Sequence, residues 1–149
     1  MDRTERVELT TLCMICRENQ ILLQKRAKKD WDGYVFPGGH VEPGESIVQC
    51  VIREMREETG LTVVDPRLCG VKQFPIDGGR YIVFLFRADR FEGELRSSEE
   101  GEVEWVSRDS LSSCPLAEDM EDLIRVMDSD RLTEFQYIID GTEWIVSLH

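Results

Sequence analysis

The chain has 149 residues, of which 41% are hydrophobic and 32% are charged, and this composition suits one soluble folded domain with a sizeable core. Its formal net charge of −12 argues against binding to a nucleic-acid polymer, because such binding depends on Lys and Arg side chains that neutralise phosphates. No apolar run approaches the roughly 20 residues that a membrane span needs. Residues 1–6 lack a signal-peptide core, so we expect a cytoplasmic protein with no membrane partner.

The chain begins with a predicted β-hairpin. Residues 7–16 and 20–26 have strand-like patterns, with Glu18 and Asn19 at the turn. Residues 28–33 are polar and predict a loop. Residues 34–36 are a short extended segment that ends at Pro37, Gly38 and Gly39, where the backbone can turn tightly and approach a ligand closely.

A helix is predicted after this glycine pair. Ser46 and Gln49 fit the capping-box pattern, and Gly60 is a natural C-terminal stop. Apolar residues recur between them at helical spacing and define one inner face. These residues are Ile47, Val48, Val51, Ile52 and Met55.

The second half of the chain predicts strands, a helix and a final hairpin. Strands are expected at residues 61–64, 68–74, 81–89 and 103–106, and an amphipathic helix at residues 116–127. Residues 135–139 and 143–146 flank Asp140 and Gly141, a strong hairpin signal. We therefore expect one α/β domain over residues 1–149, with a mixed sheet, two packed helices and a C-terminal hairpin extension at residues 133–149.

Five cysteines are scattered along the chain, and this odd number does not indicate a secreted disulfide framework. Cys13 and Cys16 have a spacing found in zinc and redox sites. They fall in a predicted strand, where side chains three residues apart point to opposite faces. We therefore expect neither zinc nor redox chemistry from this pair.

Three carboxylates crowd the second half of the predicted helix. Glu54, Glu57 and Glu58 stand at positions i, i+3 and i+4, which share one face, and the helix dipole disfavours negative charge there. A hard dication with oxygen ligands would stabilise this arrangement, and the alternative is a solvated acidic face. The apolar residues occupy the other face, so we expect the acids to point outward. Glu45 lies just before the helix, and Arg53 is placed to pair with the acids.

Residues 39–61 read GHVEPGESIVQCVIREMREETGL, which resembles the Nudix box. Every fixed position of that box agrees, namely Gly39, Glu45, Arg53, Glu54, Met55, Glu57, Glu58, Gly60 and Leu61. The resemblance implies an α/β/α sandwich over residues 5–128. It also implies hydrolysis of a nucleoside diphosphate linked to another group, with Mg²⁺, or Mn²⁺ in its place, as cofactor.

The resemblance further implies a role for each matched residue. Glu57 and Glu58 would be metal ligands, and Glu54 would ligate metal or orient or deprotonate the attacking water. A carbonyl of Gly38 or Gly39 would add a ligand, while Glu45 and Arg53 would hold the loop against the helix. The family often recruits one more acid from a distant loop, and Glu100 in residues 97–102 is our choice. The alternative for that loop is a solvated acidic turn.

The chain looks most like the MutT-type branch, which hydrolyses 8-oxo-dGTP. This likeness implies substrate contacts by Arg26, Phe36 and the start of the second helix, at Glu118 and Asp119. Each has a structural alternative: a surface strand end for Arg26, plain core for Phe36, and helix-start charge for Asp119. ADP-ribose is the alternative substrate, since Pro75 lies near the position at which ADP-ribose hydrolases carry a proline.

The sequence leaves alternatives for two features, namely catalysis by the Nudix fold and the role of the C-terminal hairpin. A Nudix fold that has lost catalysis acts as a nucleotide-binding regulator, but such loss usually shows as a broken box, and this box is intact. The C-terminal hairpin carries Phe135, Tyr137 and Trp144. It either forms an edge that pairs with a second subunit in a homodimer or packs on its own domain.

Overall fold

A computed structural model of the chain describes residues 1–26 and 33–149. In chain order the elements are β1 (Arg6–Arg17), β2 (Gln20–Arg26), β3 (Tyr34–Val35), β4 (Gly38–His40), α1 (Ile47–Thr59), β5 (Leu61–Val63), β6 (Arg67–Ile76), β7 (Gly79–Ala88), β8 (Phe91–Gly93), β9 (Gly101–Ser107), the 3₁₀ helix η1 (Arg108–Ser113), α2 (Met120–Asp128), β10 (Glu134–Asp140) and β11 (Glu143–Leu148). The loop predicted at residues 28–33 lies, except for Gly33, outside the described residues.

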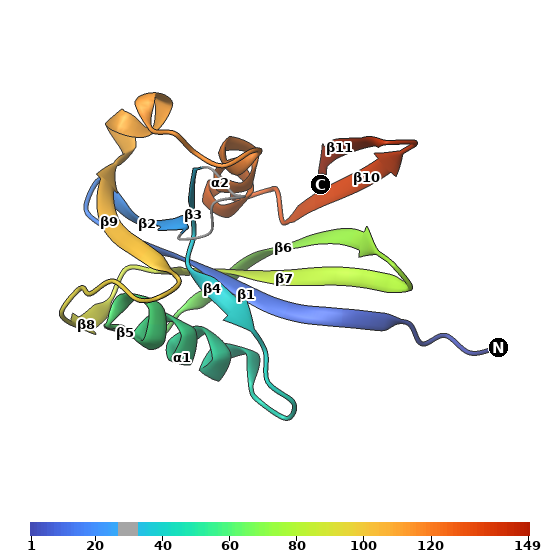
Figure 1. The fold of residues 1–149 in the computed structure, drawn as a ribbon, viewed down its shortest axis with the longest axis horizontal. Coiled ribbons are helices and arrows are strands. Elements are labelled where there is room, and N and C mark those ends of the chain that lie inside the picture. Colours follow the sequence, from blue (N-terminus) through green and yellow to red (C-terminus); the bar gives the residue numbers. More distant parts are fainter. Residues whose placement is uncertain (27–32) are drawn as a thin grey trace.

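The main sheet is mixed and runs in the order β11-β10-β6-β7-β1-β2-β3, with β4 paired to β1 and β9 paired to β2 (Figure 1). Strand β1 lies in the interior of this sheet. It pairs in parallel with β7 from Arg6 to Ile15, and antiparallel with β2 across the predicted hairpin. The edge that pairs with β2 also pairs with β4, from Thr10 to Leu12. Strands β5 and β8 form a small separate sheet.

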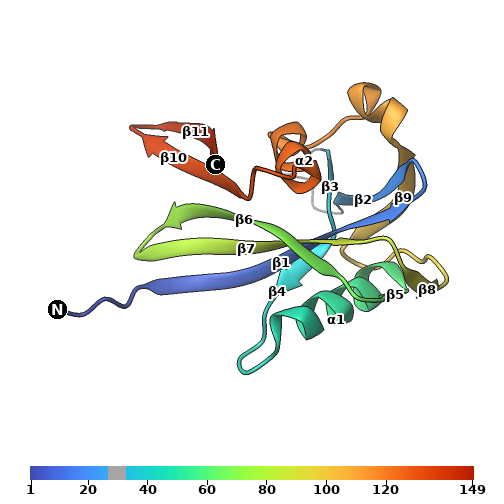
Figure 2. The same cartoon turned by 180° about the vertical axis from the view of Figure 1, so that it is seen from behind.

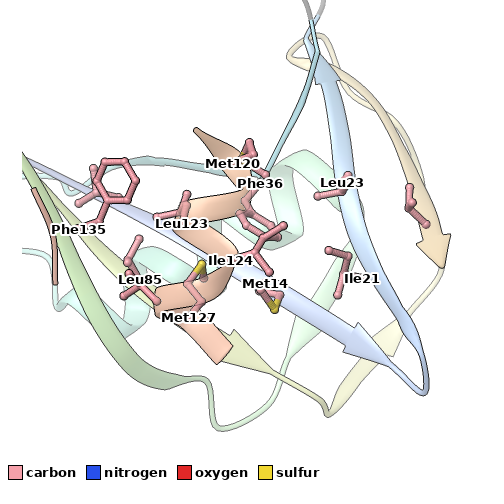
Figure 3. Packing of buried hydrophobic residues seen from close by; sticks show 13 residues of the cluster. Met14, Ile21, Leu23, Phe36, Leu85, Met120, Leu123, Ile124, Met127 and Phe135 are labelled. Carbon is pink, nitrogen blue, oxygen red and sulfur yellow. The ribbon is translucent and has the colours of Figure 1, made fainter. Parts of the chain in front are cut away.

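Helices α1 and α2 cover opposite faces of the sheet, as Figures 1 and 2 both show. Side chains alternate between the two faces along β1, so Met14 belongs to the buried cluster on the α2 side that also contains Leu123 and Phe135 (Figure 3). Cys13 and Ile15 pack with Met55 on the α1 side. The mixed sheet between helices confirms the predicted α/β fold class.

The alternation also confirms the opposite orientation predicted for Cys13 and Cys16. Cys13 belongs to the α1-side core, and Cys16 packs against the α2-side core.

Helix α1 begins and ends where the sequence predicts. The Ser46 side chain accepts a hydrogen bond from the Gln49 amide, and Gly60 ends the helix in the left-handed conformation, with φ of 79°. Val51 and Met55 are fully buried, but Val48 is 41% exposed. The prediction of Val48 on the inner face was therefore wrong, because the buried stripe is centred on Cys50, Val51, Met55 and Thr59.

Two other boundaries differ from the prediction. Gly38 and Gly39 belong to an extended strand and do not form a turn. The predicted helix at residues 116–127 begins at Met120, because Asp119 has a left-handed backbone with φ of 64° and ends any helical run before it. The short β8 and η1 were not predicted, since three-residue strands and 3₁₀ turns have little periodicity to detect.

The C-terminal hairpin packs on its own domain. Strand β10 extends the sheet by pairing in parallel with β6 from Glu134 to Gln136, and β11 pairs with β10. Phe135 is fully buried in the α2-side core. We propose on this basis that residues 1–149 form one domain with residues 133–149 as its extension. Among the helices of the described residues, none is long and apolar enough to cross a membrane.

Candidate active site

Arg53 is the centre of an ion-pair network on α1. Its Nε and Nη2 atoms donate to the two Glu45 carboxylate oxygens at 2.8 and 3.0 Å. Its Nη1 atom donates to Glu54 at 2.9 Å and to Glu57 at 3.3 Å, and Nη2 also reaches the His40 carbonyl at 3.1 Å. The hydrogen bonds from Arg53, helped by the Glu42 amide, hold the pKa of Glu45 down to about 2. Arg53 therefore joins the loop before α1, the helix itself and β4.

Glu58 lies on the other side of this network, against β4. It is 6% exposed, and its Oε2 atom accepts a hydrogen bond from the Gly38 amide at 2.8 Å. Burial, with the nearby charges of Glu54 and Glu100, raises the pKa of Glu58 to about 8, although the Gly38 bond opposes this shift. Burial also raises the pKa of Glu54, while Arg53 opposes that shift. The positive charge near Glu54 and Glu58 therefore does not fully neutralise their carboxylates.

Position 39 must be a glycine for β4 to lie in direct contact with the Glu54 carboxylate. A Cβ atom at Gly39 would sit 2.3 Å from the carboxyl carbon of Glu54. One at Gly38 would sit 2.0 Å from the Thr11 carbonyl oxygen in β1. The two glycines thus allow a strand to pair with β1 on one edge and contact the α1 carboxylates at the same time.

The three helix carboxylates do not all point outward, as the sequence had suggested. The Glu57 side chain is 60% exposed, but the Glu54 side chain is only 14% exposed and Glu58 is buried. Glu58 follows Val51 by seven residues and Met55 by three, so it falls on the inner stripe of the helix. Its polar group is accommodated there because the Gly38 amide reaches it.

The donor set matches a hard divalent cation in chemistry, because it consists of carboxylate oxygens and backbone carbonyls. Among the described residues, however, no three His, Cys, Asp or Glu side chains are grouped closely enough to hold one metal ion. The hydrogen bonds explain this, since Arg53 draws Glu54 and Glu57 toward Glu45 while Glu58 is bonded to Gly38. Glu100, the acid expected from the distant loop, is exposed and acts electrostatically on Glu54 and Glu58.

The residues expected to contact substrate lie in different surroundings. Arg26 is at the exposed end of β2 and acts electrostatically on Glu58. Phe36 is 2% exposed within the α2-side core, which agrees with the structural alternative and leaves its ring inaccessible in this conformation. Asp119 directly precedes α2 but makes no side-chain cap; its carboxylate accepts a hydrogen bond from the Tyr137 hydroxyl. Glu118 is exposed.

Sequence reasoning missed a group of side chains beside this region. Lys72 and Phe74 of β6, with Tyr81 of β7, lie close to Tyr137 and Trp144 of the hairpin. The alternating aromatic residues of the strands were the available signal. Their partners come from separate strands, so no local pattern indicates that they meet.

Comparison with known proteins agrees with this geometry. Residues 7–127 match the family model described as the NUDIX domain. The chain is 36% identical over 116 residues to an ADP-ribose pyrophosphatase of Methanocaldococcus jannaschii, covering 75% of this chain and 68% of that protein. It is 34% identical over 110 residues to an oxidized purine nucleoside triphosphate hydrolase of Danio rerio, covering 70% of this chain and 69% of that one.

A solved structure extends the likeness to nearly the whole fold. The MutT protein of Bacillus halodurans superposes with a TM-score of 0.78 at 34% identity, over 95% of this chain and 97% of that one. The matched segment contains α1, β4 and all the carboxylates described above. The chain therefore belongs to the Nudix family of hydrolases, which act on nucleotide diphosphate-linked substrates.

Proposed function

We propose that this Nudix hydrolase cleaves a nucleoside triphosphate, such as the oxidised purine 8-oxo-dGTP, to the monophosphate and pyrophosphate with the help of Mg²⁺ or Mn²⁺. The observation that carries the proposal is the crowding of Glu54 and Glu58 against the two glycines of β4, with Glu100 acting on both. Such crowding of carboxylates is stabilised when a dication shares the site.

The roles of the chain's own residues follow from their positions. In the reaction a water oxygen bonds to phosphorus, the bond to the leaving pyrophosphate oxygen breaks, and the proton of the water passes to a carboxylate. Glu54 is the residue we assign to that proton, and Glu57 and Glu58, with a carbonyl of Gly38 or Gly39, would hold the cation. A bound dication would neutralise phosphate oxygens and make the water more acidic. Arg53 and Glu45 keep the carboxylates in place before substrate arrives.

Two relatives of the chain are named for two different substrates. The zebrafish relative is named for oxidised purine nucleoside triphosphates, and the archaeal relative for ADP-ribose. The chain is almost equally identical to the two, at 34% and 36%. ADP-ribose is therefore our second candidate, and both substrates present a diphosphate bond to the same carboxylates.

A hydrolysis panel with Mg²⁺ tests the proposal. It compares 8-oxo-dGTP, the ordinary dNTPs, ADP-ribose and diadenosine polyphosphates by kcat/KM and by product. We expect 8-oxo-dGTP to be preferred, to yield 8-oxo-dGMP and pyrophosphate, and to resist cleavage when EDTA removes the metal. A preference for ADP-ribose would retain the mechanism and replace the substrate.

Two variants test the carboxylate assignment. Glu57→Gln should lower kcat by roughly 100-fold or more, because removing one group that stabilises transition-state charge has effects of that size. Glu121→Gln makes the same change at an exposed position in α2 and should leave kcat unchanged. Circular dichroism should show the same fold for both, and wild-type turnover in Glu57→Gln would overturn the assignment.

A further inference from the structure

The side chain of Gln24, in β2, carries a buried amide without a partner. Gln24 is 5% exposed, and its Nε2 group makes no hydrogen bond within the part of the chain that the structure describes. No other buried side-chain nitrogen or oxygen of the described residues is unpaired. A buried donor without a partner destabilises the fold, because it loses the hydrogen bonds that water makes to it in the unfolded chain. Such a group in a folded protein calls for an explanation, and a role in function is one.

The Gln24 side chain faces α1. Side chains alternate along β2, and Leu22, two residues before Gln24, lies in the α1-side core. The register partner of Gln24 in β9 is Val103, which belongs to the same core. Directly paired residues of antiparallel strands point to the same face of a sheet. The Gln24 amide therefore lies on the face that carries the candidate active site.

The strands on both sides of β2 lead to the carboxylates of this site. On one side Gln24 pairs with Val35 of β3, three residues before Gly38. On the other side a Cβ atom at Gly101 would lie 3.3 Å from the Gln24 Cγ atom, and Gly101 directly follows Glu100. The Gln24 side chain therefore lies between the segment that contains Gly38 and the turn that carries Glu100.

Glu58 is the carboxylate that interacts with both of these segments. Its Oε2 atom accepts a hydrogen bond from the Gly38 amide, and Glu100 and Arg26 act on it electrostatically. Arg26 follows Gln24 by two residues in β2, so the two side chains project to the same face. Among the described residues, no hydrogen bond to the other carboxylate oxygen of Glu58, Oε1, is found. An unpaired donor and an unpaired acceptor thus lie beside the same segments.

We propose that Gln24 is a positioning residue for Glu58, and that its side-chain amide donates a hydrogen bond to the Glu58 carboxylate when that carboxylate holds a cation. This inference rests on the proposed function, in which Glu58 would hold Mg²⁺ or Mn²⁺. A carboxylate that binds a metal ion is oriented by hydrogen bonds from its surroundings, and losing one weakens metal binding by about 10–100-fold. The Gly38 amide supplies one such bond, and the Gln24 amide supplies a second.

The Gln24 amide is unpaired because the hydrogen bonds of the carboxylates lead elsewhere. Glu58 is bonded to Gly38, and Arg53 draws Glu54 toward Glu45. Gln24 gains its acceptor only when Glu58 takes up a cation. Removing the amide should therefore stabilise the fold when metal is absent and weaken the binding of a cation. An amide that only supported the fold would give neither result.

Titration of the full-length chain with Mn²⁺, without nucleotide, tests the role of Gln24 independently of catalysis. Electron paramagnetic resonance measures the free Mn²⁺. Gln24→Met keeps the side-chain length and removes the amide, so we expect Kd to rise about tenfold. In urea without metal its unfolding midpoint should rise, since an unpaired buried group is removed. Gln73→Met is the matched control: the Gln73 amide donates to Glu134 at 3.1 Å, so its midpoint should fall and its Kd should not change. An unchanged Kd or a lower midpoint in Gln24→Met, or no binding of Mn²⁺ by wild type, overturns the inference.

Hydrolysis of 8-oxo-dGTP at increasing Mg²⁺ concentrations separates this inference from the proposed function. Gln24→Met should raise the Mg²⁺ concentration that gives half the maximal rate by about tenfold and leave kcat at saturating Mg²⁺ within about twofold. A variant that matches wild-type hydrolysis at every Mg²⁺ concentration would leave the proposed function in place and refute the role of Gln24. Weaker binding of Mn²⁺ by the variant, in a chain that hydrolyses no triphosphate, would support the role of Gln24 and refute the proposed reaction.

Discussion

The α1 network and the aromatic side chains that meet beside the C-terminal hairpin are built in opposite ways. Every partner of Arg53 lies between His40 and Glu57, so the network comes from one continuous stretch of chain. The aromatic side chains come from β6, β7 and the hairpin, and they contact Asp119 at the start of α2. One group depends on helix spacing and a short loop, while the other depends on the register of strands that are distant in sequence.

This difference separates the carboxylates of the proposed reaction from the docking of the hairpin. The carboxylates that we assign to bond cleavage are held by contacts that exist once α1 and β4 form. The aromatic side chains meet only after β10 has joined β6 in parallel, a pairing that needs a long crossover connection. Changes in the hairpin are therefore expected to alter stability before they alter the reaction.

The largest expected effect tests whether the hairpin belongs to the domain core. Phe135→Ala removes a fully buried ring and should lower the free energy of unfolding by about 3–5 kcal/mol. Ile138→Ala changes a 44% exposed residue of the same strand and should cost much less. Urea denaturation measures both. A loss below about 1 kcal/mol for Phe135→Ala would mean that the hairpin is not part of one cooperative domain.

The next prediction concerns the contact between β4 and the carboxylates. In Gly39→Ala the new methyl group meets the end of the Glu54 side chain, which can move, so we expect a small change in Tm but a fall in kcat of about 100-fold, or about 2.7 kcal/mol. In Gly38→Ala it meets the rigid Thr11 backbone, so Tm should fall as well. Measuring kcat and Tm for both variants separates the two roles, and equal behaviour would contradict them.

A smaller effect is expected from the geometry of Arg53. Arg53→Lys keeps the charge but cannot make the paired hydrogen bonds to Glu45, so kcat/KM should fall by about tenfold. Arg56→Lys makes the same change at an exposed position of α1 and should have no effect. Steady-state kinetics of the two variants decides the point: an equal response would show that the network of Arg53 has no special role.

The smallest expected effect concerns assembly. The aromatic side chains of the hairpin contact rings of their own domain, so light scattering should give the mass of one chain. Ile145→Lys, on the exposed face of the free edge strand β11, should leave that mass unchanged. A wild-type mass of two chains that the variant reduces to one would instead identify the hairpin edge as a homodimer interface.

The sequence by itself determined the α1 site because its interactions are local. Helix spacing places Val51 and Met55 on the inner stripe, Ser46 and Gly60 mark the ends, and Arg53 is within reach of Glu57 at position i+4. The hairpin at each end of the chain was equally predictable, because turn residues and alternating strands are local signals.

Only the tertiary structure decided the contacts of Glu58, of strand β4 and of the Tyr137 side chain. Burial of Glu58 depends on the Gly38 amide, and the extended shape of β4 depends on its pairing with β1. The link from Tyr137 to Asp119 depends on strand register and on the left-handed backbone before α2. These contacts join residues far apart in the chain, and they form only when the burial of the two cores offsets the entropy of closing the long loops between them.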